Sequence, residues 1–394
     1  MFSPDPLDVA KRQLDRDKQA TSQFPALFAQ KLTRMSASPL AYLRGTAPLF
    51  YELLAQHPDL ADGPAGEGWL VGDAHLENFG AFRTDDADES ACFDVNDFDE
   101  AIIGPLRWDV LRLLTSVILG GRELGSSGKQ SVALCSSILQ GYVDALAQNN
   151  VPKDLPPPVR RLLDKVLQRT HKDLLDKRTE KVGNARRFVR GDRYPDLAPD
   201  LLPKARAAFA AYVERLDPNG KLPRDHFAVE DVAFRVAGNG SLGALRVAVL
   251  TRGKGELDNR WIFDMKAEGA PSAQAQALLP APAEAPAERV RTATLICLKH
   301  PPRMLGTTEL EGKSMFVRRL SPQEDKLDLT HMKAEELPAL ARYLGALLGR
   351  VHARGAKTPP AASWTQAELS VLIERAIAIA GLHEAAYLAL CRTL

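Results

Sequence analysis

The stretch from Gly72 to Asn78, GDAHLEN, and the stretch from Asn96 to Ala101, NDFDEA, decide how this chain is interpreted. The surrounding sequence GWLVGDAHLENFGAF indicates a short apolar strand that enters a polar loop. In the same way, ACFDVNDFDEAIIG indicates a second strand that is interrupted by carboxylates. Acidic and amide side chains therefore gather where two strands stop, and we expect the chemistry of the protein there.

These side chains fit phosphoryl transfer, which requires a carboxylate to orient the attacking hydroxyl and oxygen ligands for magnesium. Asp73 and Asn78 are close enough in the loop for the carboxylate to face an acceptor while the amide oxygen turns towards a metal. Either Asp97 or Asp94 supplies the charged metal ligand, and Asp97 is the first choice. His75 either shuttles protons or contacts a phosphate, or it is a hydrogen-bonded structural histidine.

The bulk properties of the chain exclude several classes of protein. Its 394 residues suffice for two lobes, because single cores stop growing below this size. A formal net charge of +1 gives no general attraction to nucleic acid or membranes. Four scattered cysteines without a CxxC pair indicate thiols in a reducing compartment. No apolar stretch approaches the roughly 20 residues of a membrane span, and no signal-like segment opens the chain, so we expect a cytoplasmic protein.

The order of helical and strand-like segments predicts an α+β protein. Residues 1–225 form an α-rich lobe that carries the acidic loops, with a charged helical region running to about residue 216. Residues 226–325 form a β-rich, nucleotide-binding lobe, because FAVEDVAFRVAG, ALRVAVLTRG and NRWIFDMKAE indicate an antiparallel sheet. TATLICLK and KSMFVRRL are expected to add two more strands. Residues 326–394 are C-terminal helices that return to the α-rich lobe.

A glycine loop in the β-rich lobe is the candidate for phosphate binding. Gly238, Gly240 and Gly243, with Ser241 between them, form a GxGxxG whose amides can approach phosphates closely. The loop leads into LRVAVL, a β-branched run that suits a hairpin rather than the helix of a dinucleotide fold. In the following strand-like segment, WIFDMKAE, Lys266 lies near the end and is the candidate cation for the phosphates.

The acidic motifs resemble those of the protein-kinase-like superfamily, in particular its aminoglycoside and choline kinase branch, where a GDxHxxN loop is followed by an (I/N)DFxxA segment. The resemblance implies that Asp73 is the catalytic base and that Asn78 and Asp97 are magnesium ligands. Asp109, in the sequence RWD, resembles the aspartate that braces the catalytic loop.

Lys266 resembles the kinase lysine that contacts the α- and β-phosphates, and Glu268, Glu284 and Glu288 are candidates for its carboxylate partner. In kinases the glycine loop and this lysine precede the catalytic loop, whereas here they follow it. We therefore expect a circularly permuted kinase-like fold with a large α-rich lobe and a smaller antiparallel β lobe.

A longer set of segments, from SPLAYLRGTAPLFYELLA through the acidic motifs to GRVHARG, resembles a bacterial family of uncharacterised proteins known as domain of unknown function 2252. This resemblance covers most of the chain and supplies no substrate. Arg44, in YLRGTAP, is expected either to reach an anionic substrate or to brace the acidic segment.

Together these features predict a phosphotransferase that uses ATP and Mg²⁺ and acts on a hydroxyl of a small molecule or a protein. Two alternatives stay open at this stage: nucleotidyl transfer (AMPylation) at the same site, and a non-catalytic ATP-binding scaffold or sensor. Nucleic acid and membranes are not expected as partners.

Overall fold

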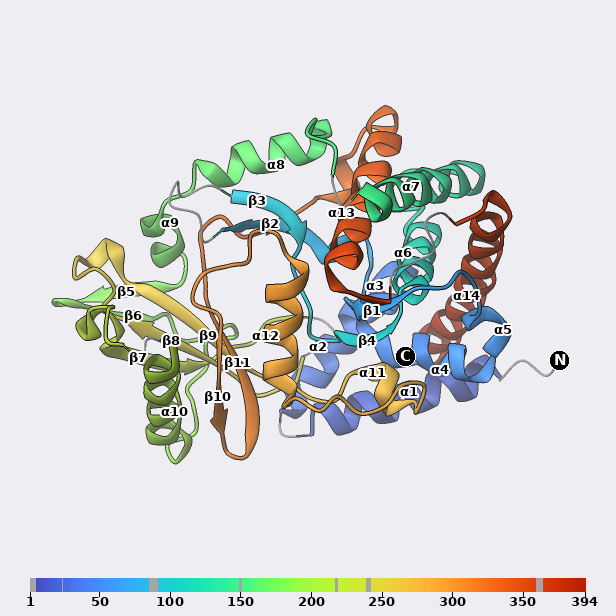
Figure 1. Ribbon diagram of the computed structural model, residues 1–394. Coiled ribbons are helices and arrows are strands. Elements are labelled where there is room, and N and C mark those ends of the chain that lie inside the picture. The colour runs from blue at the N-terminus through green and yellow to red at the C-terminus, as the bar shows by residue number, and fades with distance from the viewer. Residues whose placement is uncertain are drawn as a thin grey trace.

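The computed structural model describes residues 5–22, 24–84, 91–148, 151–216, 219–238, 242–358 and 364–394. The chain is α+β, as predicted, and combines many helices with small antiparallel sheets (Figure 1).

Several helices begin at a proline or directly after a residue whose side chain caps the first turn. Thr365 begins the last helix with a capping box, in which its hydroxyl accepts from the Glu368 amide and the Glu368 carboxylate accepts from the Thr365 amide. In the described part of the chain the α-helices are α1 (Pro6–Ala20), α2 (Pro25–Met35), α3 (Pro39–Gly45), α4 (Ala47–Gln56), α5 (Pro58–Ala61), α6 (Arg107–Leu119), α7 (Gly128–Gln148), α8 (Pro157–Leu167), α9 (His171–Asp176), α10 (Leu201–Leu216), α11 (Ser272–Ala275), α12 (Pro286–Cys297), α13 (Leu337–Gly355) and α14 (Gln366–Thr393). Short 3-10 helices cover Leu76–Asn78, Arg224–Phe227, Leu257–Asn259, Leu329–His331 and Ala334–Glu336.

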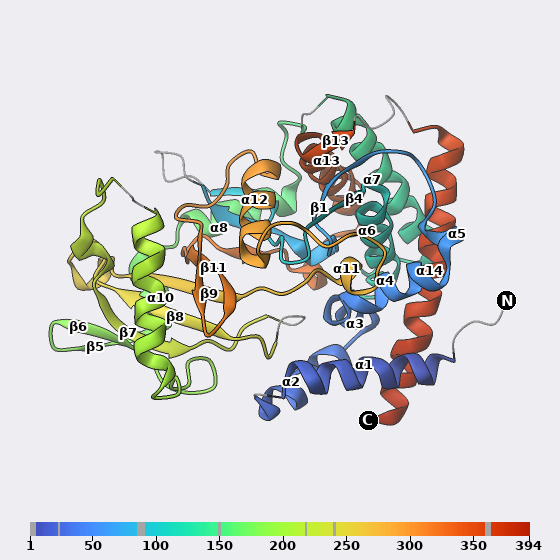
Figure 2. The same cartoon turned by 60° about the horizontal axis from the view of Figure 1, so that its bottom comes forward.

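The strands pair in antiparallel fashion in four sheets. They are β1 (Glu67–Leu70), β2 (Phe79–Arg83), β3 (Ala91–Val95), β4 (Ile102–Pro105), β5 (Thr179–Val182), β6 (Ala185–Phe188), β7 (Val229–Phe234), β8 (Arg246–Thr251), β9 (Trp261–Ala267), β10 (Gly306–Leu310), β11 (Lys313–Arg319), β12 (Asp325–Lys326) and β13 (Ala356–Thr358). The sheet orders are β10-β11-β9-β8-β7, β13-β1-β4, β12-β2-β3 and β5-β6. Figure 2 shows the five-stranded sheet and α10 on one side of the molecule and most of the helices on the other.

The five-stranded sheet buries both of its faces. Val247 and Val249 of β8 belong to a cluster shared with α10, whereas Ala248 and Leu250 belong to a cluster shared with Phe188 of β6. This alternation follows from the two-residue period of a strand. The sheet therefore has a core of its own, which holds its strand ends in fixed positions.

Glycines allow α7 and α13 to pack closely in the helical part. A Cβ atom on Gly345 would lie 2.0 Å from the carbonyl oxygen of Ile138, and one on Gly141 would lie 2.0 Å from that of Arg342. Any larger residue would push the two backbones apart. From the end of α13, β13 pairs with β1, and β4 pairs with the opposite edge of β1. Segments from the two ends of the chain thus meet beside the acidic loop that follows β1.

Two secondary-structure predictions are wrong. TATLICLK, expected as a strand, lies largely in α12 (Figure 1), where the small residues Ala287 and Ala293 are fully buried against neighbouring elements. The charged region before residue 216 is interrupted by the hairpin of β5 and β6, because Gly183 in the turn adopts a left-handed conformation with φ of +58°. Tertiary packing outweighs local propensity in α12, whereas the β5–β6 hairpin follows from a local glycine turn.

Within the described ranges, no helix combines the length and the apolar character required to cross a bilayer.

Candidate active site

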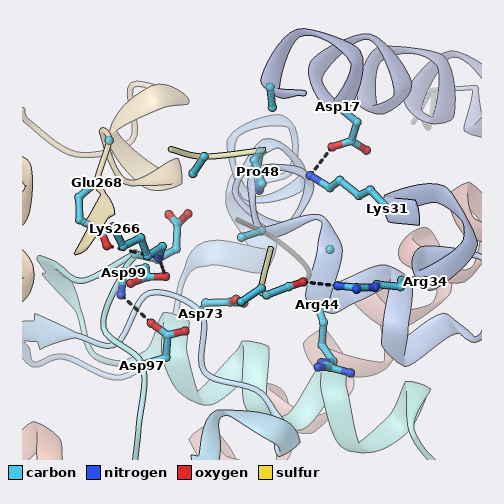
Figure 3. Close-up of a pocket in the computed structure, with 18 of the residues that line it drawn as sticks. Asp17, Lys31, Arg34, Arg44, Pro48, Asp73, Asp97, Asp99, Lys266 and Glu268 are labelled. Carbon is cyan, nitrogen blue, oxygen red and sulfur yellow. Dashed lines mark hydrogen bonds and ion pairs between the residues drawn. The ribbon is translucent and has the colours of Figure 1, made fainter. Parts of the chain in front are cut away.

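The acidic motifs line one side of a cavity of about 770 Å³. Asp73, Asn78 and Asp97 come from the segments after β1 and β3, and Lys266 comes from β9 of the five-stranded sheet. Figure 3 shows Lys266 and Asp97 near one another, with Asp73 further along the wall. The fold therefore brings Asp73, Asn78, Asp97 and Lys266 to one cavity.

Asp109 holds the backbone that precedes Asp73. Its carboxylate accepts hydrogen bonds from the amides of Val71 at 2.6 Å and Gly72 at 2.9 Å. Its Oδ2 also lies 3.0 Å from Nε2 of His352 on α13, and Nδ1 of that histidine lies 2.9 Å from the Tyr142 hydroxyl. This buried network fixes the backbone at the start of the loop.

Gly72 cannot be replaced by another residue without moving the backbone. Its φ is +81°, and an added Cβ would lie 2.0 Å from the carbonyl oxygen of Glu100. The two acidic motifs are therefore in direct backbone contact.

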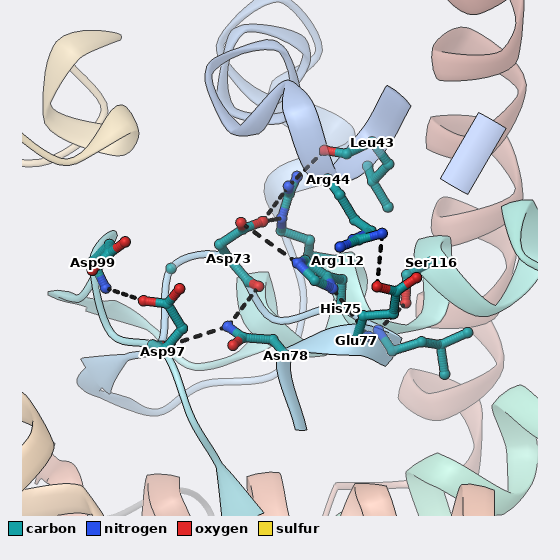
Figure 4. Close-up of polar contacts among 12 residues, drawn as sticks. Leu43, Arg44, Asp73, His75, Glu77, Asn78, Asp97, Asp99, Arg112 and Ser116 are labelled. Carbon is teal, nitrogen blue, oxygen red and sulfur yellow. Dashed lines mark hydrogen bonds and ion pairs between the residues drawn. The ribbon is translucent and has the colours of Figure 1, made fainter. Parts of the chain in front are cut away.

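The carboxylate of Asp73 is oriented by Arg112 on α6. Nε of Arg112 donates to Asp73 Oδ1 at 2.6 Å, and Nη2 of the same guanidinium forms an ion pair with that oxygen (Figure 4). Burial raises the pKa of Asp73 to about 6, although the arginine opposes this shift. The result is a carboxylate in fixed orientation that is ionised at neutral pH and holds a proton more readily than an ordinary aspartate.

His75 is part of the loop structure. Its Nδ1 accepts from the Glu77 amide at 3.1 Å, and its Nε2 lies 3.7 Å from Asp73 Oδ2. Burial holds the pKa of His75 well below its usual range, and nearby cations act in the same direction. The imidazole is therefore neutral at physiological pH, which favours the structural interpretation over a proton shuttle.

Asn78 presents an oxygen that suits a magnesium ion. Its Nδ2 donates to the backbone oxygens of Asp73 and Asp97, each at 3.1 Å. Oδ1 of Asn78 is buried and has no hydrogen-bond partner within the described ranges. An orphaned buried acceptor is costly unless a ligand satisfies it, and magnesium prefers oxygen ligands.

Asp97 lies opposite this amide and also lines the cavity. One of its oxygens, Oδ1, accepts from the Asp99 amide at 3.2 Å. Within the residues that the structure describes, no group of three or more His, Cys, Asp or Glu side chains is arranged around a metal position. A magnesium ion held here would take one carboxylate and one amide oxygen from the protein, with water and phosphate at its other positions.

Asp94, the second candidate metal ligand, lies elsewhere. Its carboxylate forms an ion pair with Arg350 of α13 and lines neither of the two cavities beside the acidic motifs. Burial raises the pKa of Asp94, and Arg350 opposes that shift. In this structure Asp94 connects β3 to α13, which leaves Asp97 as the carboxylate beside Asn78 in the cavity.

Lys266 has two carboxylate partners. Its ammonium group pairs with Asp99 Oδ2 and lies 3.3 Å from Glu268 Oε1. Burial raises the pKa of Glu268 to about 7. Glu268 is one of the three carboxylate partners that the sequence suggests for Lys266. Another of the three, Glu288, pairs with Arg291 at 2.6 Å instead. Asp99 was not among the candidates.

The glycine loop is described only in part. Gly238 has a φ of +88° and lines the cavity, and its carbonyl oxygen accepts from Arg34. Gly243 has a φ of +104°, and an added Cβ would lie 2.7 Å from the Ala20 carbonyl oxygen. Gly240 and Ser241 lie outside the described residues. The described glycines adopt conformations that other residues rarely take.

A second cavity of about 330 Å³ opens beside the first. The two cavities share Asp97, Asp99, Gly238, Lys266 and Lys326. Apolar side chains from the sheet, from α12 and from the segment after it form part of its lining, namely Val290, Leu298, Leu305 and Phe316. This apolar wall next to Lys266 was not predicted from the sequence.

Three cationic residues near the acidic motifs were missed or left open by sequence reasoning. Arg112 follows Asp109 by three positions on α6, a spacing that puts both side chains on the same helix face and could have revealed it. Lys326, in the edge strand β12, has no such signal. Arg44 pairs with Glu77 at 2.7 Å, so it braces the acidic segment while it also lines the cavity.

The fold and the site thus define an α+β protein with a carboxylate-lined cavity that a lysine from an antiparallel sheet enters. The model of the family described as "Uncharacterized protein conserved in bacteria (DUF2252)" matches residues 23–393, and the chain belongs to this family. Comparison with curated proteins and with solved structures gave no match.

Proposed function

We propose that the protein is a magnesium- and ATP-dependent phosphotransferase of kinase-like type. The position of Lys266 carries the proposal. This lysine follows Asp99 by 167 positions in the chain, yet its ammonium group pairs with Asp99 in the cavity that Asp73 and Asp97 also line. Phosphoryl transfer from a nucleotide requires a cation for the phosphates beside oxygen ligands for the metal.

The arrangement of α13 supports a circularly permuted kinase-like fold. In the kinases that the motifs resemble, a helix leads into the catalytic loop. Here α13 ends at Gly355, and β13, which follows directly, pairs with β1, the strand that leads into Gly72. A permuted connection would therefore need only a short link between these neighbours.

Magnesium and ATP have separate sets of candidate contacts. Asn78 Oδ1 and the Asp97 carboxylate would hold magnesium, which supplies positive charge against the phosphates when bound. Lys266 would exchange its contact with Asp99 for the phosphate oxygens. The apolar wall around Phe316 in the smaller cavity suits the base of the nucleotide.

Asp73 would act as the base in the transfer. It accepts a hydrogen bond from the acceptor hydroxyl and takes its proton as the hydroxyl oxygen bonds to the γ-phosphorus. The bond between the γ-phosphorus and the bridging oxygen breaks, and ADP leaves with that electron pair. A pKa of about 6 keeps Asp73 ionised at neutral pH while making it a better proton acceptor than an ordinary aspartate. Arg112 holds the carboxylate in place.

The first test is nucleotide binding and turnover by the purified full chain. We expect ATP to bind in the presence of magnesium, measured by titration calorimetry, and ADP to form slowly with water as acceptor. Asp73→Asn should abolish ADP formation, whereas Asp59→Asn, which changes an exposed aspartate on α5, should not. The proposal fails if ATP does not bind with magnesium, or if Asp73→Asn forms ADP at the wild-type rate.

Mass spectrometry of nucleotides and protein separates the alternatives. ADP and a phosphorylated product support phosphoryl transfer, whereas pyrophosphate and an adenylylated product indicate nucleotidyl transfer. Binding of ATP without any turnover, with Asp73→Asn indistinguishable from wild type, would indicate a scaffold or sensor.

A further inference from the structure

The larger cavity extends well beyond the acidic motifs, to a wall formed by α1 and α2. Gln13, Asp17 and Lys31 line this far end (Figure 3 labels Asp17 and Lys31), across the cavity from Lys266 and Asp97. Asp73 lies between the two ends. A molecule bound at the α1–α2 wall would therefore present its near side to the proposed base.

The lining of the cavity excludes an apolar or aromatic occupant. In the described ranges, its apolar contributions come from alanine, glycine, one proline and one valine, and no Phe, Tyr, Trp, Leu, Ile or Met side chain lines it. Pockets for apolar ligands are lined mainly by large hydrophobic and aromatic side chains. The volume of about 770 Å³ also exceeds what the phosphates of a nucleotide need. Space for a polar small molecule remains.

Most of the basic side chains near this wall are paired with carboxylates. Lys31 Nζ lies 2.6 Å from Asp17 Oδ1, and Arg16 pairs with Glu52. Arg44 of the adjoining α3 pairs with Glu77 at 2.7 Å, and Arg34 of α2 donates to the Gly238 carbonyl oxygen. An anionic ligand would have to displace one of these carboxylates. A cationic ligand would meet the basic side chains of the same pairs. The wall therefore favours an uncharged ligand.

Polar atoms on α1 remain without a partner. Gln13 and Asp17 are each 2% exposed, and Gln13 Nε2 donates to Asp17 Oδ1 at 3.1 Å. This leaves Gln13 Oε1, Asp17 Oδ2 and the Arg16 Nη1 group without a hydrogen bond inside the described part of the chain. The first two can only accept, and the third can only donate. Hydroxyl groups satisfy both requirements, because each one donates and accepts.

We propose that the α1–α2 end of the cavity binds an uncharged polyhydroxylated small molecule, such as a sugar or a cyclitol, as the acceptor for phosphoryl transfer. This inference rests on the proposed function for the role of the ligand as acceptor, but the binding itself does not depend on turnover. Gln13 and Asp17 are specificity-determining residues in this account, and Asp73 acts on the hydroxyl that faces it.

The test measures binding and turnover separately on the full chain. Glucose, trehalose, myo-inositol and sorbitol serve as neutral probes; glucosamine and glucose 6-phosphate serve as cationic and anionic probes. We expect at least one neutral probe to bind by saturation-transfer NMR and to increase ADP formation from magnesium and ATP, with the charged probes weaker by about tenfold or more.

A matched pair of variants locates the site. Gln13→Leu removes the amide from the cavity wall, and we expect it to raise the dissociation constant and KM for the neutral probe by about tenfold, with a smaller change in kcat. Gln19→Leu makes the same change at an exposed position of the same helix and should leave both constants unchanged. Asp17→Asn gives a second variant of the wall if Gln13→Leu unfolds.

The outcomes for the two proposals are distinct. Neutral-probe binding that is lost in Gln13→Leu supports the acceptor site even if no phosphoryl transfer occurs, in which case only the proposed function fails. The inference is overturned if magnesium and ATP bind but no neutral probe does, if a charged probe binds more tightly, or if neither wall variant affects binding.

Discussion

Acidification should abolish the proposed phosphotransferase activity by protonating Asp73. Burial raises the pKa of this carboxyl from 3.8 to about 6. At pH 5 about one tenth of Asp73 is then ionised, whereas a carboxyl with an unshifted pKa would be about nine tenths ionised. We therefore expect kcat/KM for phosphoryl transfer to be level above about pH 7 and to fall about tenfold by pH 5.

The same shift makes a prediction for stability. Because the pKa of Asp73 is higher in the folded chain than in the unfolded chain, the neutral carboxyl favours folding, and this contribution is lost as the pH rises through about 6. A shift of two units corresponds to about 3 kcal/mol at neutral pH as an upper figure, because 23% of the side chain remains exposed. Asp73→Asn keeps a neutral acceptor for Arg112, so it should raise the free energy of unfolding at pH 7 and have little effect near pH 4.

Both effects can be measured with wild type, Asp73→Asn and the surface variant Asp59→Asn, by steady-state kinetics and by urea unfolding across the pH range. The wild-type acid limb should lie near pH 6, and Asp59→Asn should follow wild type. A kcat/KM that stays level to pH 4.5, or an Asp73→Asn protein less stable than wild type at pH 7, would refute the argument.

Four other substitutions address the nucleotide, the metal and the fold. Lys266→Ala should raise KM for ATP about tenfold or more, while Lys313→Ala at an exposed strand position should not; equal values would contradict the phosphate role. Asn78→Leu should shift the magnesium dependence of activity to about tenfold higher concentration, and an unchanged dependence would exclude its oxygen as a ligand. Gly345→Ala should lower the free energy of unfolding by about 1–3 kcal/mol because its Cβ would meet a backbone carbonyl. Gly381→Ala, where a Cβ meets no atom within 4 Å, should raise it by about 0.5–1 kcal/mol, and urea unfolding tests both.

Sequence patterns predicted the α+β class and the acidic motifs because both are local. Strand and loop signals around Gly72 and Asn96 depend on residues within one segment, and the fold leaves them where those signals put them. The β-branched and aromatic runs of β8 and β9, bounded by glycine-containing turns, likewise indicate two strands of the sheet. In these segments the local sequence alone is enough to indicate the secondary structure that forms.

Contacts between distant segments could not be predicted in the same way. Asp99 as a partner of Lys266 depends on how the sheet lies against the β3–β4 connection, and Asp94 is removed from the cavity by Arg350, 256 positions later. The segment TATLICLK is rich in β-branched residues, which favour a strand, but its buried residues Ala293, Thr294 and Cys297 recur at helical spacing on one face of α12. Pairings of this kind require the three-dimensional arrangement.

The close packing of α13 on α7 bears on how the protein is made. The network that holds the loop before Asp73 includes His352, which leaves the ribosome only after the whole five-stranded sheet has been synthesised. A nascent chain that ends before α13 therefore lacks the helix that packs on α7, and it also lacks the contact of His352 with Asp109. Synthesis must therefore pass His352 before Asp109 can make this contact.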